Sequence, residues 1–232
     1  MIKYFVLCLS LCVITITAQE VPPIQVGVYT GVKGDVNAGT IPSGWKTLGT
    51  FASIPDIGIS GKIPFYDAYA LSALIDIGCT ASAFGVKPFY SPTDSNTNVL
   101  HATYLGIAPQ IMFQYGFLGL NIGIPLSAAK VAIDGNTNEQ TYRTLAYKSD
   151  MSTLIEFRLG GMLPFIEDAH GVLSGYIIAS YQLNGAIANF TTVSPLLYPS
   201  TPVSTENNPK NAGVCIGLRY MFNWVSNSEP EE

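Results

Sequence analysis

The chain has 232 residues, of which 48% are apolar and only 12% are charged, and its formal net charge at pH 7 is −5. A charged fraction this low is unusual for a water-soluble protein, whose surface must stay solvated. The acidic balance excludes the basic patch by which a protein binds nucleic acid. No long unbroken apolar run follows the amino-terminal segment, which excludes a bundle of membrane-spanning helices.

The amino terminus has the three parts of an export signal. Lys3 supplies a positive charge, Tyr4 to Ile16 form an apolar run, and Thr17 and Ala18 offer a small-residue cleavage site before Gln19. The apolar run is shorter than the ~20 residues that a membrane-spanning helix needs. We therefore predict a signal peptide over residues 1–18.

Beyond the signal, eight segments carry apolar residues at every second position, which is the period of a β-strand. In chain order they cover residues 24–32, 57–63, 71–80, 105–114, 118–126, 155–163, 171–187 and 213–224. One apolar and one polar face suit a sheet with lipid outside and a polar lumen inside. The seventh segment is apolar on both faces, so its orientation stays open. We predict an all-β fold, an eight-stranded antiparallel up-and-down transmembrane β-barrel over residues 19–224, followed by an acidic tail at residues 225–232.

The connections between these segments alternate in length. Short connections are expected at residues 64–68, 115–116 and 164–170, and long ones, rich in Gly, Asn, Ser, Thr and Pro, at residues 33–53, 81–99, 130–150 and 188–210. Short turns on one side and long loops on the other are typical of an outer-membrane barrel with both termini on the periplasmic side. The long loops would then be extracellular, and such loops carry recognition.

The same alternation assigns a set of polar side chains to the lumen. A charge that faces lipid near the midplane costs a few kcal/mol, so charged residues have a strong reason to turn inward and pair. An eight-stranded barrel has room for side chains and little else. We predict a lumen charge network, structural as a fixed plug or gating as a path that opens for ions or solutes, made of Lys62, Asp76, Gln110, Gln114, Glu156, Arg158 and Arg219.

No catalytic or metal-binding pattern stands out. The two histidines, His101 and His170, have no cysteine or carboxylate at metal-ligand spacing. Ser127 and Ser174 lack an evident His and Asp set, although a triad is assembled in space and need not show in sequence order. We expect no catalytic residue, no metal and no cofactor, and hence a non-enzymatic protein. A membrane hydrolase remains the alternative.

Three stretches carry a resemblance to a known family: the export junction Ala18-Gln19, the strand Tyr104-Leu105-Gly106-Ile107-Ala108-Pro109, and the end Ile216-Gly217-Leu218-Arg219-Tyr220-Met221-Phe222. With them the chain resembles the small outer-membrane β-barrels of the porin-family or PorT-like type found in Bacteroidetes and Chlorobi, and is similar to the eight-stranded OmpA-type and OmpW-type barrels. The acidic tail departs from this pattern, because many such barrels stop at a terminal Phe or Trp.

The resemblance implies a location and a set of partners. It implies the cell outer membrane of a Gram-negative-type bacterium, with outer-membrane lipid around the barrel and the barrel-assembly machinery as a partner during biogenesis. The role expected first is structural or a surface interaction through the long extracellular loops. The OmpW-type likeness implies, as an alternative, a narrow channel or transporter for small or apolar solutes. The PorT-like likeness implies an accessory component of a secretion apparatus. The surface ligand is not identified.

Overall fold

The computed structural model of the protein describes residues 24–66, 71–89, 97–134, 137, 139–144, 150–168 and 170–223. The predicted signal peptide and acidic tail lie outside these residues. Among the helices of the described segments, none is long and apolar enough to cross a membrane.

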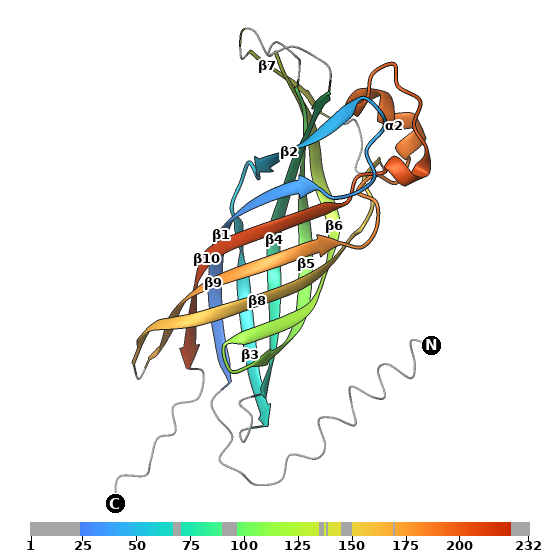
Figure 1. Ribbon diagram of the computed structural model, residues 1–232. Coiled ribbons are helices and arrows are strands. Elements are labelled where there is room, and N and C mark those ends of the chain that lie inside the picture. Colours follow the sequence, from blue (N-terminus) through green and yellow to red (C-terminus); the bar gives the residue numbers. More distant parts are fainter. Residues whose placement is uncertain are drawn as a thin grey trace, which may run out of the picture.

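Eight strands close into one antiparallel ring, as predicted (Figure 1). In ring order they are β1 (Gln25–Asn37), β3 (Asp56–Tyr66), β4 (Leu71–Pro88), β5 (Thr97–Phe113), β6 (Gly116–Ile133), β8 (Leu154–Glu167), β9 (Gly171–Gln182) and β10 (Asn211–Asn223). The ring closes where β1 pairs with β10. This seam runs from Gln25 opposite Asn223 to Asn37 opposite Asn211 without a register shift.

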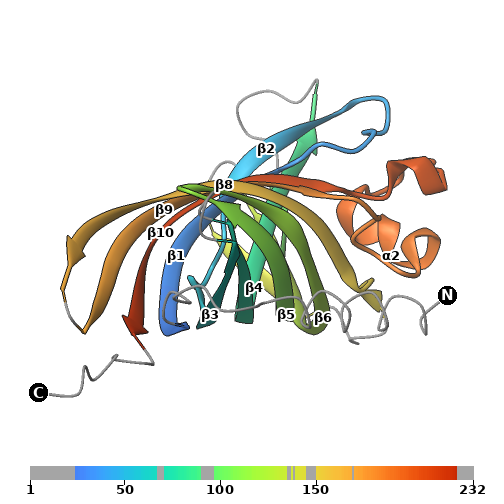
Figure 2. The same cartoon turned by 90° about the horizontal axis from the view of Figure 1, so that it is seen from below.

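Two more strands lie at the end of the barrel with the long connections. β2 (Trp45–Phe51) pairs with β1 and β4, and β7 (Gln140–Thr144) pairs with β6. The β9–β10 connection, residues 183–210, holds α2 (Phe190–Leu197) and the short 3-10 helix η3 (Thr205–Asn207). We call this connection the cap lobe. It projects to one side of the barrel in both views (Figures 1 and 2).

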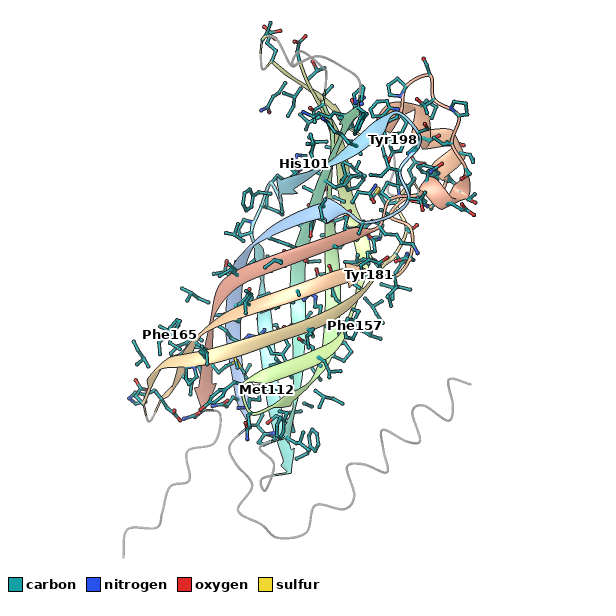
Figure 3. All side chains as sticks on the ribbon, in the orientation of Figure 1. His101, Met112, Phe157, Phe165, Tyr181 and Tyr198 are labelled. Atoms are coloured by element: carbon teal, nitrogen blue, oxygen red, sulfur yellow. The ribbon has the colours of Figure 1, made fainter. Side chains whose placement is uncertain are left out.

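The outer wall of the barrel is apolar all the way round. Outward side chains at the middle of the eight ring strands are 44–55% exposed, namely Val28, Ile59, Ile77, Ile107, Ile122, Leu159, Ile177 and Leu218. Many of them face one another across successive strand pairs, for example Val28 and Ile59, then Ile59 and Ile77. A water-soluble monomer rarely exposes a continuous apolar surface of this size. We call this surface the apolar belt (Figure 3).

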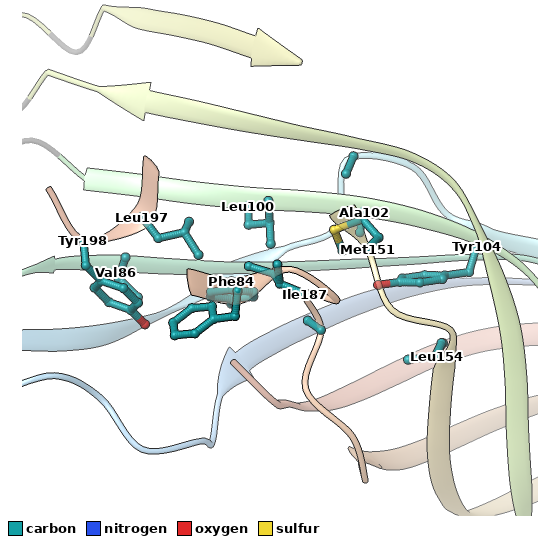
Figure 4. Close-up of a cluster of buried hydrophobic side chains, with 13 residues drawn as sticks. Phe84, Val86, Leu100, Ala102, Tyr104, Met151, Leu154, Ile187, Leu197 and Tyr198 are labelled. Atoms are coloured by element: carbon teal, nitrogen blue, oxygen red, sulfur yellow. The ribbon is translucent and has the colours of Figure 1, made fainter. Parts of the chain in front are cut away.

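The cap lobe covers the inner face of the upper barrel (Figure 4). Phe84 and Val86 of β4 and Leu100 of β5 are at most 1% exposed there, and they pack with Leu197 and Tyr198 of the lobe. We call this group the cap cluster; it consists of Phe84, Val86, Leu100, Ala102, Tyr104, Ala128, Met151, Leu154, Ala186, Ile187, Phe190, Leu197 and Tyr198.

Polar contacts fix the lobe on the cap cluster. The Asn98 side chain donates to the Leu197 carbonyl at 3.0 Å, and the Trp45 indole donates to the Thr201 hydroxyl at 2.9 Å. The Trp45 and Tyr198 rings meet edge to face with centroids 5.3 Å apart. Burial raises the pKa of Tyr198 to about 12, so its hydroxyl stays protonated.

The structure confirms the eight predicted segments and the alternation of short and long connections. It also corrects their bounds: the predicted seventh strand ends at Gln182, and β4, β5 and β6 extend into the segments expected as loops. These extensions form because their inner faces bury Phe84, Val86 and Leu100 under the cap lobe. The sequence left open which face of the seventh strand points into the barrel; in the structure, Ser174, Tyr176 and Ile178 of β9 face inward.

Candidate functional site: the charged lumen

Charged side chains of β1, β4, β8 and β10 meet in ion pairs inside the lumen, where the strand period places them. Lys33 and Asp35 come from β1, Asp76 from β4, Glu156 and Arg158 from β8, and Arg219 from β10; all are at most 4% exposed. They fall into two groups. The lower group lies nearer the short turns, and the upper group lies nearer the cap cluster.

The lower group is built on Asp76 and Arg219. The Arg219 guanidinium contacts one Asp76 carboxylate oxygen at 2.7 Å, and the Gln110 amide donates to the same oxygen at 2.8 Å. The Ser60 hydroxyl donates to the other oxygen at 2.6 Å. Donors from β3, β5 and β10 therefore converge on one carboxylate of β4, and charge-assisted bonds of this kind are the stronger class.

Two tyrosine rings enclose the Arg219 guanidinium. Its central carbon lies 5.5 Å from the Tyr29 ring centroid and 5.4 Å from the Tyr176 ring centroid, within cation–π range. Two facing glycines make room for the Tyr29 hydroxyl: a Cβ on either Gly58 or Gly78 would lie 2.7 Å from it. The glycines on these strands thus serve the packing of the lumen.

The upper group is built on Glu156. The Lys33 ammonium contacts one carboxylate oxygen at 2.6 Å, and Arg158 contacts the other at 3.0 Å. The Asn121 amide donates to that second oxygen at 3.2 Å. Asp35 lies 3.5 Å from the same ammonium, so Lys33 bridges two carboxylates. Both oxygens of Glu156 therefore have cationic partners, which a buried carboxylate requires.

Asp35 and Asp56 also complete the wall of the barrel. β3 begins at Asp56, so the edge of β4 above this level has no β3 residue beside it. The Ala81 N–H donates to Asp56 at 2.9 Å, and the Ala83 N–H donates to Asp35 at 3.2 Å. The two carboxylates thus accept bonds that a neighbouring strand would otherwise accept, since buried backbone N–H groups need a partner.

The structure brings five of the seven predicted lumen residues into these groups: Asp76, Gln110, Glu156, Arg158 and Arg219. Lys62 is half-buried and lines a cavity of about 200 Å³ at the short-turn end, together with Gln25 and Glu167. Gln114 lines the same cavity rather than either charged group. It is exposed in the turn between β5 and β6 with φ 52°, because the strand period ends at Phe113.

Sequence reasoning missed Lys33, Asp35 and Asp56. The first predicted strand stopped at residue 32, although Lys33, Asp35 and Asn37 continue the inward parity of Tyr29. Extending the alternation of the first strand past residue 32, and that of the second strand back to residue 56, would have assigned all three to the lumen. Within the part of the chain that the structure describes, no cluster of His, Cys, Asp and Glu could hold a metal ion.

Comparison with known proteins gives no family model that matches the chain and no curated relative. Among solved structures, the attachment invasion locus protein Ail of Yersinia pestis is 10% identical, with a TM-score of 0.39, 87% of this chain covered and 99% of that one. Neisserial surface protein A is 10% identical with a TM-score of 0.33, covering 84% and 95%. The outer membrane protein OprG of Pseudomonas aeruginosa is 10% identical with a TM-score of 0.35, covering 88% and 97%. Similarity of this degree identifies no family.

Proposed function

We propose that the chain is an outer-membrane β-barrel with a sealed lumen, which serves as a scaffold for its extracellular elements and catalyses no reaction. The observation that carries the proposal is the filled lumen. Arg219 at its centre is 0% exposed, and the cap cluster lies above the upper group. Below and beside Arg219, apolar side chains such as Leu74, Met112 and Met162 are buried as well. A solute path would have to displace all of these layers.

The apolar belt supports the membrane location. Its outward side chains would be costly in water, whereas hydrocarbon accepts them, and a closed ring leaves no strand edge unpaired in lipid. At the level of the belt, the charged side chains of Asp76, Glu156, Arg158 and Arg219 face the other way, as a lipid-facing wall requires. With the predicted export signal, these features favour an outer membrane over any other surrounding.

Planar-bilayer conductance of the refolded mature chain, residues 19–232, tests the sealed lumen. A heat-modifiable shift on gel electrophoresis first establishes an intact barrel. We expect the shift together with no conductance, because the ion pairs and the cap cluster fill the lumen. Reproducible channels from shifted protein would overturn the sealed reading and make Lys33, Glu156 and Arg158 candidates for a gate.

Cysteine labelling on intact cells tests the location and the orientation. In a Cys79→Ala background, Thr191→Cys places a thiol on the exposed start of α2, and Gln114→Cys places one in an exposed short turn. A membrane-impermeant maleimide should label the first variant on whole cells and the second only after lysis. Labelling of both, or of neither, on whole cells would contradict the proposed placement.

A further inference from the structure

A groove of about 640 Å³ indents the outer wall at the upper border of the apolar belt. Small outward residues form its floor, namely Gly34 of β1, Ala179 of β9 and Ala212 of β10. Phe51 of β2, which is 73% exposed, overhangs one side, since a Cβ on Gly34 would lie 3.4 Å from its ring. The groove opens onto the belt beside Val32 and Ile216, which are 59% and 63% exposed.

A second, polar pocket of about 460 Å³ lies directly above the groove. The same three chain segments line both cavities. They contribute Val36 and Ala38 at the end of β1, Ala179 and Tyr181 on β9, and Ala212 and Lys210 at the beginning of β10, where Ala38 and Lys210 each lie one residue outside the strand. Residues two apart on a strand point to the same face and lie about 7 Å apart. The two cavities therefore form one continuous surface, apolar below and polar above. Figure 3 places Tyr181 on this wall, below the cap lobe.

Two hydrogen bonds border the polar pocket. The Ala38 N–H donates to the Lys210 carbonyl at 2.7 Å, and the Asn208 side-chain amide donates to the Ile187 carbonyl at 2.6 Å. The first bond joins the cap lobe to the residue after β1, and the second lies within the lobe. In the described part of the chain, no carboxylate lies within 4.0 Å of the Lys210 ammonium. Glu206 lines the same pocket with an exposed carboxylate.

We propose that this amphiphilic groove binds one membrane lipid, with an acyl chain on Gly34, Ala179 and Ala212 and a zwitterionic headgroup in the polar pocket. The headgroup's phosphate pairs with Lys210, and its amine pairs with Glu206. The occupant is a lipid because the apolar half is continuous with the belt and the polar half lies at its border. One cation and one carboxylate match a headgroup that carries both charges, such as phosphoethanolamine, better than a purely anionic one. The inference rests on the membrane location proposed above.

Native mass spectrometry of the refolded mature chain in detergent tests the site. The protein is titrated with palmitoyl-oleoyl phosphatidylethanolamine or with the matching phosphatidylglycerol. We expect one retained phosphatidylethanolamine and weaker retention of phosphatidylglycerol. Ala179→Trp and Ala212→Phe, which fill the groove from the lipid side, should each lower the affinity about tenfold. Ala73→Trp, on the outer face of β4 away from the groove, is the matched control and should leave it unchanged.

Two charge variants test the headgroup assignment. Lys210→Gln should weaken phosphatidylethanolamine binding about tenfold, because it removes a charge-assisted hydrogen bond. Glu206→Gln should remove the preference over phosphatidylglycerol. Lys46→Gln and Glu139→Gln, which make the same charge changes elsewhere, should do neither.

Each contrary result would overturn the proposal in a recognisable way. Equal retention of both lipids by all variants would mean that only unspecific belt lipid binds. A dimer lost in Ala179→Trp, without bound lipid in the original protein, would assign the groove to a second copy of this chain. Variants that keep the heat-modifiable shift are folded, so loss of binding in them reports on the groove. Absence of that shift in the unaltered protein would instead contradict the intact barrel on which the proposed function rests.

Discussion

Arg219→Met tests whether the lower group acts as a unit. The substitution keeps a long side chain between Tyr29 and Tyr176 but leaves the Asp76 carboxylate, which is 2% exposed, without its cation. Breaking one side of a buried ion pair costs about 3–5 kcal/mol. Asp76 keeps donors from Ser60 and Gln110, so the lower end applies, and we expect a loss of about 3 kcal/mol in the free energy of unfolding.

A double-mutant cycle gives the decisive comparison. Asp76→Asn should cost about 3 kcal/mol alone, because Arg219 then stays buried and charged without a carboxylate. If the two effects were independent, the double variant would lose about 6 kcal/mol; as a coupled pair it should lose only about 1–2 kcal/mol. Urea unfolding in lipid vesicles, followed by the heat-modifiable shift, measures all four proteins. Simple addition of the two losses would refute the coupling, and Lys46→Met is the control, expected within about 0.5 kcal/mol of the original.

Three further predictions concern packing, the cap lobe and a turn. Gly58→Ala should destabilise the barrel by about 1–3 kcal/mol in the same unfolding assay, since its Cβ would clash with the backbone carbonyl oxygen of Ile77 and lie 2.7 Å from the Tyr29 hydroxyl. Gly61→Ala, with nothing within 4 Å, should be neutral, and equal effects of the two would refute the packing argument. Leu197→Ala should cost about 2–5 kcal/mol of local stability in the cap lobe and speed proteolysis there; unchanged cleavage would show that the lobe is held otherwise. The backbone N–H groups of His170 and Gly171 donate to the Asp168 carboxylate and lower its pKa. These hydrogen bonds are fully present above the ordinary pKa of an aspartate, and they are lost as the pH falls through the lowered pKa of Asp168. The amide NMR signals of those two residues should shift at that lower pH, and Asp168→Asn should abolish the shift.

The ring of strands is predictable because lipid and lumen impose opposite demands on alternate residues. A segment such as Ile155 to Leu163 can satisfy both only as a strand, so its inward Glu156 and Arg158 are predictable from the sequence. The pairing of Arg219 with Asp76 is not predictable in this way, because the alternation determines which face of the sheet a residue lies on but not its height in the barrel. Gln114 shows where the alternation stops predicting the position of a side chain, because the period of two ends when the chain turns after Phe113.

The elements beyond the belt follow other rules. β2, β7 and α2 lie where neither lipid nor lumen acts on alternate residues, so no period marks them. Their segments are rich in Gly, Asn, Ser and Pro, which favours turns by composition. They are ordered by contacts with distant parts of the chain, such as Trp45 against Tyr198. Contacts of this kind cannot be read from the local sequence.

The seam between β1 and β10 has a consequence for biogenesis. It joins Gln25 to Asn223, so β1, the first strand of the ring, has one free edge until β10 has been made. An open edge is not tolerated in hydrocarbon, and pairings this distant in sequence form slowly. If the ring spans a membrane as proposed, its closure depends on the carboxyl-terminal strand, and a chain cut short before β10 would be left as an unsealed sheet with two edges exposed to aggregation.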